Sequence, residues 1–486
     1  MARKGLSKSK VMSGIQCPKR LYLEVYKPEL ADYSEATSAF AIGHEFGDLA
    51  RTLYPQGVLI EHNDNLTAAI EETSHQLKSD SVRTIFEGTF SHHGVLVRAD
   101  ILQKNSASLD LTEVKASTSV KDYHILDCAI QAWVIQRAGH PVERIQLAHV
   151  NRDFVYPGGG QYEGILTKVD VTEEAMEFEP QIMGWVETLQ SVLAGSEPDI
   201  KVGDQCNRPF TCPFQSYCYP PQPDYPVTEL PGKGKIVKEL LAEGIVDIRD
   251  IPAGRLTSPT QERVRRVTMA GTEELLPGAS ELLRALPYPR YYLDFETIGM
   301  VVPRWEGTRP YQGLPFQWSC HIELETGEIK HTEYLDTSGE PPMRCLAEAL
   351  IKTLGEAGPI FTYTKFENDV IRGLAQMFPD LAPSLKQLIS RLFDLHPVVR
   401  DHYYHPDMLG SWSIKAVLPA IAPELSYTAL NDVQDGMAAG QAYLAILSPQ
   451  TEQERREELI RALLDYCKLD TLAMVRVAHK LMRSGA

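Results

Sequence analysis

The residues most clearly suited to chemistry are two carboxylates that interrupt an apolar segment at residues 291–297. Side chains alternate faces along a strand, so Asp294 and Glu296, two residues apart, point to the same side. Two like charges held that close require a divalent cation. Near residue 468 a helical pattern places Tyr466 and Asp470 one turn apart on one face. The spacing therefore predicts a metal site to which a distant helix adds an acid and a phenol.

A second acidic group lies in a segment whose period changes to that of strands. Three β-branched-rich strands separated by short polar turns are predicted at residues 83–90, 95–102 and 109–115. Asp100 ends the apolar run of the second strand, and Glu113 and Lys115 share one face of the third. This set suits phosphodiester hydrolysis: Asp100 and Glu113 bind Mg²⁺ or Mn²⁺, and Lys115 orients the attacking water or stabilises charge on the phosphate. The alternative is an exposed salt bridge along a strand.

The elements after this meander must position those side chains. A helix is predicted at residues 123–138, carrying Gln131, and an apolar strand at residues 145–150. Strand, helix and strand in this order predict a crossover, with the site at the edge of the sheet.

Three cysteines occur at even intervals, at Cys206, Cys212 and Cys218, in a loop rich in proline and aromatic residues. Three soft ligands require a fourth, and four thiolates suit either a [4Fe–4S] cluster or Zn²⁺. Zinc sites usually carry closely paired cysteines, which are absent, so the spacing favours iron–sulfur over zinc. The remaining thiols are interpreted as core or incidental residues: Cys128, Cys320, Cys345 and Cys467.

The composition of the chain limits which classes of protein it can belong to. The 486 residues are 43% hydrophobic and 23% charged, enough for two or three domains. No apolar run reaches the roughly 18 residues of a membrane span, and the basic N-terminus lacks the apolar core of a secretory signal, so we expect a cytoplasmic protein without membrane contact. A net charge of −17 argues against bulk coating of nucleic acid but leaves room for a local basic groove. The six basic residues within 1–20 are interpreted as a solvated helix face, with a phosphate-contacting edge as the alternative.

The sequence is predicted to form three parts. The proline-rich residues 220–226 predict a boundary, which separates a domain at 1–222 from a helical linker at 223–285 with a faint helix–hairpin–helix pattern. The remaining part, 286–486, has strands followed by alternating helices and strands. Its closing helix shows capping-box spacing between Thr451 and Glu454.

The order His44, Asp100, Glu113-Val114-Lys115 and then Gln131 resembles the RecB-type nucleases of the PD-(D/E)xK superfamily, particularly the CRISPR-associated RecB-like branch. The resemblance implies His44 as a further metal ligand and a catalytic role for Gln131. This sequence departs from the family pattern at Ile135, where family members often have Tyr. RecB-like nucleases with an iron–sulfur staple carry one cysteine before the fold and three after it, which implies Cys17 as the fourth cluster ligand.

A second resemblance covers the last domain. Asp294-x-Glu296, the pair Phe366-Glu367, and Tyr466-x-x-x-Asp470 are similar in order and spacing to the DnaQ-like DEDD exonucleases with Tyr in the third motif. It implies that Asp294, Glu296, Glu367 and Asp470 hold two metal ions, that Tyr466 orients the attacking water, and that attack starts at a 3′ end. Two positions depart from the pattern: Glu367 stands where Asp is usual, and Thr364 near the usual Asn.

Together the two halves resemble a bacterial family that fuses a RecB-like nuclease to a DEDD-type exonuclease-like domain, with residues 410–415, ending in Lys415, typical of its C-terminal half. The resemblance implies an α/β protein with a restriction-endonuclease-like domain and an RNase H-like domain. We expect a metal-dependent nuclease with two active sites that acts on DNA, favoured over RNA, in repair, processing or defence. The alternatives are an RNA-directed exonuclease, or a nucleic-acid-binding scaffold in which one site is vestigial.

Overall fold

The protein folds into two compact mixed α/β units in the computed structural model. The structure describes residues 5–33, 36–62, 65–232, 234–427, 430 and 432–483, without the side chains of residues 36–40. Unit 1 comprises Met1–Pro220 with Met300–Tyr311, and unit 2 comprises Pro221–Gly299 with Gln312–Ala486. The segment at 223–285 falls within unit 2.

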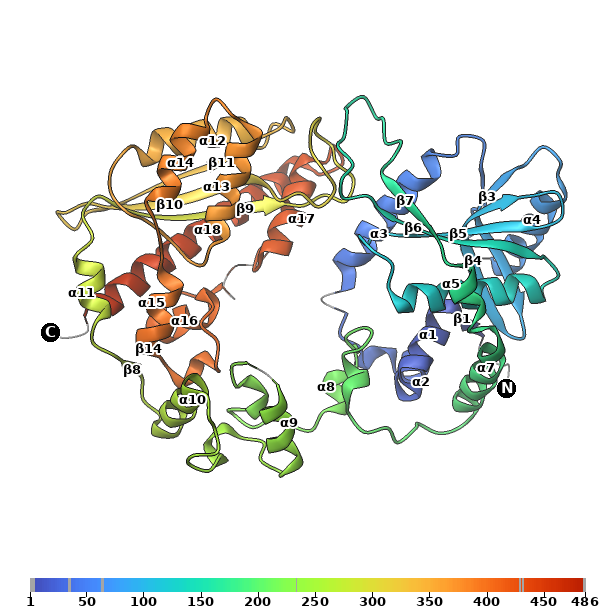
Figure 1. The fold of residues 1–486 in the computed structure, drawn as a ribbon, viewed down its shortest axis with the longest axis horizontal. Helices are drawn as coiled ribbons and strands as arrows, with labels where there is room; N and C mark the ends of the chain where they lie inside the picture. The colour runs from blue at the N-terminus through green and yellow to red at the C-terminus, as the bar shows by residue number, and fades with distance from the viewer. Residues whose placement is uncertain are drawn as a thin grey trace. The chain divides into compact units, whose positions relative to one another are not determined.

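A seven-stranded sheet forms the centre of unit 1, in the order β2–β3–β4–β5–β6–β7 with β1 beside β4 (Figure 1). Its strands are β1 (Leu6–Ser7), β2 (Val58–Leu59), β3 (Thr84–His92), β4 (Val95–Lys104), β5 (Leu109–Lys115), β6 (Val142–Val150) and β7 (Leu166–Asp170). Strands β3, β4 and β5 form the predicted antiparallel meander. Strand β6 returns parallel to β5 through helix α5 (Asp122–Arg137), which confirms the predicted crossover.

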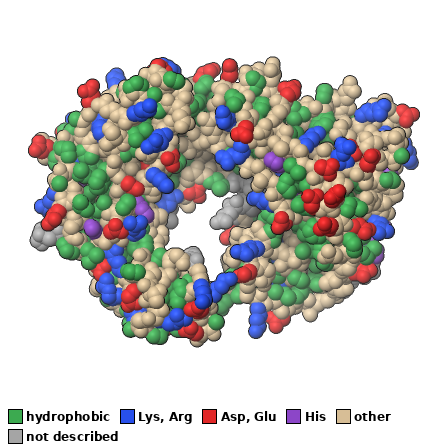
Figure 2. Space-filling model, viewed as in Figure 1, with side chains coloured by type: hydrophobic (Ala, Val, Ile, Leu, Met, Phe, Trp, Pro, Cys, Tyr) green, Lys and Arg blue, Asp and Glu red, His purple; other side chains and the backbone are tan. Residues whose placement is uncertain are grey.

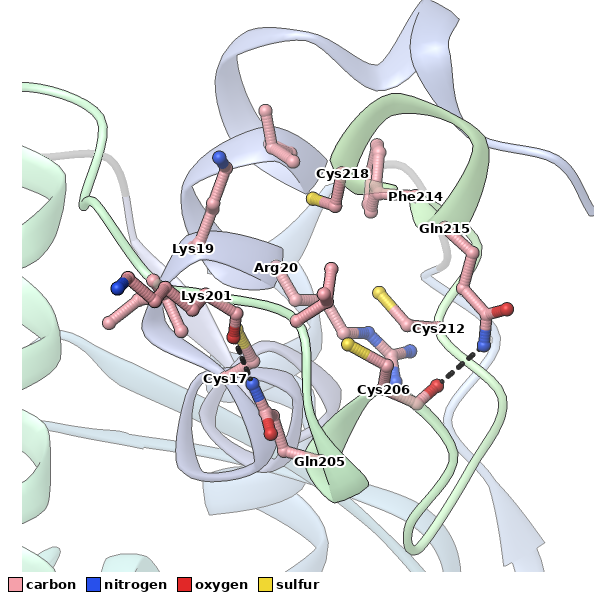
Figure 3. A pocket seen from close by; sticks show the side chains of 13 residues that line it. Cys17, Lys19, Arg20, Lys201, Gln205, Cys206, Cys212, Phe214, Gln215 and Cys218 are labelled. Atoms are coloured by element: carbon pink, nitrogen blue, oxygen red, sulfur yellow. Dashed lines mark hydrogen bonds between the residues drawn. The ribbon is translucent and has the colours of Figure 1, made fainter. Parts of the chain in front are cut away.

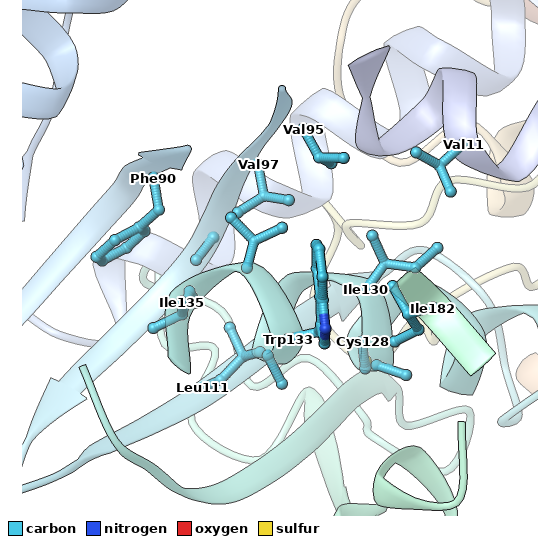
Figure 4. Close-up of a cluster of buried hydrophobic side chains, with 14 of the residues drawn as sticks. Val11, Phe90, Val95, Val97, Leu111, Cys128, Ile130, Trp133, Ile135 and Ile182 are labelled. Carbon is cyan, nitrogen blue, oxygen red and sulfur yellow. The ribbon is translucent and has the colours of Figure 1, made fainter. Parts of the chain in front are cut away.

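The core of unit 1 lies between this sheet and its helices. The remaining helices are α1 (Lys8–Gln16), α2 (Pro18–Tyr26), α3 (Ala36–Thr52), α4 (Leu66–Lys78), α6 (Thr172–Met176), α7 (Glu179–Ala194) and the short α8 (Gln215–Cys218). Helix α5 is buried from Asp127 to Ile135, and apart from Asp127 and Gln131 the side chains of this stretch are apolar. Its Trp133 and Ile130 pack among strand residues such as Val97 in the cluster of Figure 4.

A five-stranded sheet forms the centre of unit 2, in the order β11–β10–β9–β12–β13 (Figure 1). The strands are β9 (Arg290–Ile298), β10 (Leu314–Glu323), β11 (Ile329–Leu335), β12 (Ile360–Thr362) and β13 (Leu392–Asp394). Strands β9, β10 and β11 are antiparallel neighbours, whereas β12 and β13 run parallel to β9. The predicted carboxylate-bearing strand is thus the middle strand of the sheet.

Helices surround this sheet and fill the rest of unit 2. They are α9 (Lys235–Ala242), α10 (Pro259–Ala270), α11 (Ala279–Arg284), α12 (Met343–Leu354), α13 (Phe366–Met377), α14 (Ala382–Ser390), α15 (Leu395–His402), α16 (Ile414–Ile421), α17 (Gly436–Leu447) and α18 (Gln453–Met482), beside a two-stranded pair of β8 (Glu274–Leu275) and β14 (Tyr403–Tyr404).

Helix α18 packs along β9 and β10 through a stripe of buried apolar residues. Its existence was predicted, but the predicted capping box was wrong. The N-cap is Glu452, and the Thr451 hydroxyl instead donates to the carbonyl of Ala445, 2.6 Å away. A hydrogen bond to the preceding helix has therefore replaced the local cap.

No helix in the described part of the chain is both long and apolar enough to cross a membrane. Acidic and basic side chains are intermixed over the surface of each unit in the view of Figure 2.

Candidate functional site

The acids of β9 lie on one side of the strand, as its period predicted. One ligand atom each of Asp294, Glu296 and Cys467 lies within 4.8 Å of the other two. Cys467 comes from α18, and its Sγ lies 3.6 Å from Oδ2 of Asp294. Cys467 was interpreted as a core or incidental thiol, and it is buried in the core, but the packing of α18 on β9 also aims it at the acids. Burial raises the pKa of this thiol well above its usual range, so it stays neutral.

Two further acids reach this cluster from other elements. Glu367 lies in the first turn of α13, is 2% exposed, and hydrogen-bonds Asp294. Its Oε2 is buried with no hydrogen-bond partner among the described residues. Asp470 lies on α18, one turn after Tyr466, and both side chains are buried. The structure therefore gathers the four predicted acids around β9, with one carboxylate oxygen left without a partner.

Burial and mutual repulsion disfavour ionisation of this acid cluster. Burial, with the negative charge of neighbouring carboxylates, raises the pKa values of Asp294, Glu296 and Glu367 well above their usual range. Burial raises the pKa of Asp470 from 3.8 to about 6, although the Tyr427 hydrogen bond and Lys415 oppose the shift. Hard carboxylate oxygens and an unpartnered buried acceptor are the donor set that Mg²⁺ or Mn²⁺ prefers.

Two aromatic residues and one lysine flank the acid cluster. Tyr427 donates a hydrogen bond to Oδ1 of Asp470 at 2.6 Å, and its ring lies 6.1 Å from that of Tyr466. The Lys415 ammonium lies 5.4 Å from the centre of the Tyr466 ring and 5.6 Å from that of Tyr427. It also donates to the carbonyl of Gln434 at 2.7 Å. Sequence spacing gave no signal for Tyr427, which lies 43 residues before its partner.

The acids and the lysine of the predicted nuclease motif converge in unit 1. Lys115 Nζ lies 2.6 Å from Oε1 of Glu113, and Gln131 donates to Oε2 of the same carboxylate at 2.6 Å. Asp100 faces them from β4 and accepts a hydrogen bond from the backbone N–H of Val114 at 2.7 Å. The Oε1 atom of Gln131 is buried without a hydrogen-bond partner in the described structure. Strands β4 and β5 and helix α5 thus bring four of the predicted residues together.

Two further residues complete this group: Asp127, which the sequence analysis did not single out, and Lys8, which belongs to the basic N-terminal run. Asp127, one turn before Gln131 on α5, accepts from Lys115 Nζ at 2.6 Å. Lys8, the first residue of α1, places its ammonium 2.9 Å from Glu113 and 3.0 Å from Asp127. The interpretation of the basic N-terminal run as a solvated face was therefore wrong for Lys8. An Asp four residues before Gln131 was the available signal for Asp127.

Neighbouring charges shift the pKa values of the two central acids of this group, Asp100 and Glu113, in opposite directions. Burial, with the charge of Glu113, raises the pKa of Asp100 from 3.8 to about 8. Burial acts in the same direction on Glu113, but the ammoniums of Lys115 and Lys8 outweigh it and hold the pKa of Glu113 well below its usual range. Glu113 is thus the ionised member of the pair at neutral pH. A cation bound between them would ionise Asp100.

His44 lies apart from these contacts. It is exposed on α3, a helix that packs against β5, and no described hydrogen bond joins its imidazole to Asp100 or Glu113. Its role as a metal ligand stays a prediction. Ile135, which departs from the family pattern, is fully buried in the core of unit 1.

All four predicted cluster cysteines line one pocket of unit 1 (Figure 3). Cys17 is the residue between α1 and α2, and Cys206, Cys212 and Cys218 come from the loop that ends in α8. No three of these sulfur atoms all lie within 4.8 Å of one another in the described structure. A closed tetrahedral zinc site, with Zn–S bonds of about 2.3 Å, would hold its sulfurs about 3.8 Å apart. The four thiols line one pocket, and the choice between an iron–sulfur cluster and zinc stays a prediction.

Comparisons with known proteins give the chain no function. A family model described as a domain of unknown function (DUF2779) matches residues 291–413, which include Asp294, Glu296 and Glu367. No curated protein matches the chain. A solved structure titled "Crystal structure of SSO0001" matches with 15% sequence identity and a TM-score of 0.26, covering 45% of this chain and 88% of that one.

Proposed function

We propose that this protein is a metal-dependent nuclease that hydrolyses DNA phosphodiesters at two sites, one in each unit. Unit 2 would be an RNase H-like 3′–5′ exonuclease domain of the DEDD type with Tyr, and unit 1 a RecB-like PD-(D/E)xK nuclease domain. DNA repair, processing or defence would be its setting.

The observation that carries the proposal is the cluster of four acids around β9, of which Glu296, Glu367 and Asp470 are buried and Asp294 is half-buried. Burying carboxylates together without compensating charge is costly, and a protein retains such a cluster where a cation binds. The unpartnered Oε2 of Glu367 supports the same conclusion. The sheet order also supports an RNase H-like fold, since three antiparallel strands are extended by two parallel ones with the acids on the middle strand.

In unit 2, Asp294, Glu296, Glu367 and Asp470 would hold the divalent cations, which supply an activated water and charge neutralisation when bound. The Tyr466 phenol, whose pKa is raised by burial and the neighbouring acids, keeps its proton and so orients that water as a donor or acceptor. Near the two rings, the Lys415 ammonium is placed to attract the phosphate of the incoming strand.

In unit 1, Asp100 and Glu113 would hold a cation, with His44 as a further ligand. Gln131 donates to one oxygen of Glu113 and so fixes the orientation of the carboxylate. Lys115, 2.6 Å from the other oxygen, orients the attacking water or stabilises charge on the phosphate. The four cysteines would carry a [4Fe–4S] cluster that ties α2 to the loop before α8.

End-labelled single- and double-stranded DNA and RNA, incubated with Mg²⁺ or Mn²⁺, test the proposal. Asp294→Asn should abolish release of mononucleotides from the 3′ end, and Glu113→Gln should abolish the other activity. Asp369→Asn, an exposed acid on α13, and Asp122→Asn, an exposed acid at the start of α5, are the matched controls.

A 3′-blocked substrate should resist the activity of unit 2, while a 5′-blocked one is degraded normally. Full 3′ trimming by the Asp294→Asn, Glu113→Gln double variant would refute the exonuclease assignment. Cleavage of RNA but not DNA would support the RNA-directed exonuclease instead. Binding of nucleic acid without cleavage would support the scaffold alternative.

A further inference from the structure

The side chain of Lys8 enters the unit 1 site from outside the predicted motif. Its ammonium contacts Oε1 of Glu113 at 2.9 Å and Oδ1 of Asp127 at 3.0 Å. Lys115 contacts the same two carboxylates, at 2.6 Å each, through Oε1 of Glu113 and Oδ2 of Asp127. Two ammoniums therefore share two carboxylates, although only Lys115 belongs to the recognised spacing.

The position of Lys8 is built into the fold. It is the first residue of α1, whose N-cap Ser7 accepts a hydrogen bond from the N–H of Lys10. At the other end of the helix, the Gln16 amide donates to the carbonyls of Gln205 and Phe210 at 2.7 Å, in the loop of the cysteines.

Helix α1 also packs closely on its neighbour. A Cβ added at Gly14 would lie 2.5 Å from a methyl carbon of Leu189 on α7, so α1 approaches α7 at a position without a side chain. Helix α1 is thus held at both ends and along one side, which fixes its first residue at the site.

A cation that binds Oε1 of Glu113 would displace an ammonium from that oxygen. Oε2 of Glu113 accepts from Gln131, and both lysines occupy Oε1. The Lys8 side chain is 20% exposed whereas that of Glu113 is 2% exposed, so the lysine lies on the solvent side of the cluster, where a substrate would enter. An ammonium displaced from Oε1 would stay beside the cation and face that substrate.

The formal charges favour an anionic ligand at this point. With Asp100, Glu113 and Asp127 all ionised, as a bound cation would require, the three carboxylates and the two ammoniums together carry one negative charge. A divalent cation would make it one positive charge, the complement of a single phosphodiester. Removing Lys8 would leave the loaded site neutral and without that attraction.

We propose that Lys8 is a second phosphate-binding cation of the unit 1 site, which contacts the scissile phosphodiester beside Lys115 once a divalent cation occupies Glu113. The inference rests on the proposed nuclease function of that site. Lys8→Met and Lys8→Arg test it, with Lys10→Met as the matched control. Lys10 follows by two residues on the same helix, so its side chain does not face the site, and its ammonium makes no described ion pair.

Two measurements separate phosphate binding from a structural role. The first is the affinity for an end-labelled oligonucleotide in Ca²⁺, measured by fluorescence anisotropy over a range of salt concentrations. Lys8→Met should weaken binding by about tenfold or more, since it removes a hydrogen bond between charged groups. It should also reduce the slope of log Kd against log salt concentration by about 0.7–0.9, the value of one phosphate contact.

The second measurement is cleavage in Mg²⁺ or Mn²⁺. Lys8→Met should lower kcat/KM, Lys8→Arg should restore most of the binding and its salt slope, and Lys10→Met should match the wild type. The proposal is wrong if Lys8→Met keeps the wild-type affinity and salt slope while Glu113→Gln abolishes cleavage. It is equally wrong if Lys8→Met lowers the melting temperature and leaves the salt slope unchanged, because Lys8 is then only an ion-pair partner. A wild-type protein that cleaves nothing at this site contradicts the nuclease function instead.

Discussion

Replacing Asp470 with Asn should stabilise unit 2 in the absence of divalent cations. Burial raises the pKa of Asp470 to about 6 from the 3.8 of the unfolded chain, so the folded state binds the extra proton between these values. Stability then falls as pH rises from 3.8 to about 6, and the full penalty persists above pH 6. The amide keeps an oxygen that can accept from Tyr427 but carries no charge.

The size of the effect follows from the two pKa values. Ionised Asp470 costs the folded state about 3 kcal/mol above pH 7, roughly half of that at pH 5 and little at pH 4. Asp470→Asn should therefore raise the melting temperature by about 6–12 °C at pH 8 in a unit of this size, and by little at pH 4.

Thermal unfolding in EDTA at pH 4, 5 and 8, followed with and without Mg²⁺ or Mn²⁺, checks this reasoning. Cation binding should stabilise the wild type strongly at pH 8 and the variant much less, because Asp470 is one of the proposed ligands. Asp465→Asn, an exposed acid on the same helix, is the matched control. The reasoning is wrong if Asp470→Asn is no more stable than Asp465→Asn at pH 8. It is also wrong if the cation raises the melting temperature of both variants equally, because the acid cluster is then not a cation site destabilised by buried charge.

Three further outcomes are expected. Protein prepared without oxygen should be brown with about four irons per chain, and Cys17→Ala should lose the colour; stoichiometric zinc in a colourless preparation would contradict the cluster. Tyr427→Phe removes the hydrogen bond that favours ionised Asp470, so the acidic limb of the pH–rate profile of 3′ trimming should move to higher pH; an unchanged limb would exclude this role. Gly358 and Gly327 have similar positive φ angles, +87° and +84°, but a Cβ at Gly358 would lie 2.0 Å from the carbonyl oxygen of Pro289, whereas one at Gly327 would meet open space. Gly358→Ala should therefore lower the urea midpoint of unit 2 far more than Gly327→Ala. Equal losses would mean that backbone strain alone sets the loss of stability.

Local periodicity determined the elements that carry the proposed sites. The period of two placed Asp294 and Glu296 on one side of β9, and the same rule paired Glu113 with Lys115 on β5. The helical period placed Tyr466 and Asp470 one turn apart on α18. These relations hold within a few residues of chain, so they follow from backbone geometry once the element type is known.

Only the tertiary structure decided which side chains from distant elements complete each group. Lys8 and Glu113 are 105 residues apart, and Cys467 and Asp294 are 173 apart, so no spacing rule links them. A basic run and a lone thiol look alike in sequence whether they face solvent or a buried carboxylate. The packing of α1 and α18 against their sheets settles that difference, because it fixes which face of each helix meets the acids.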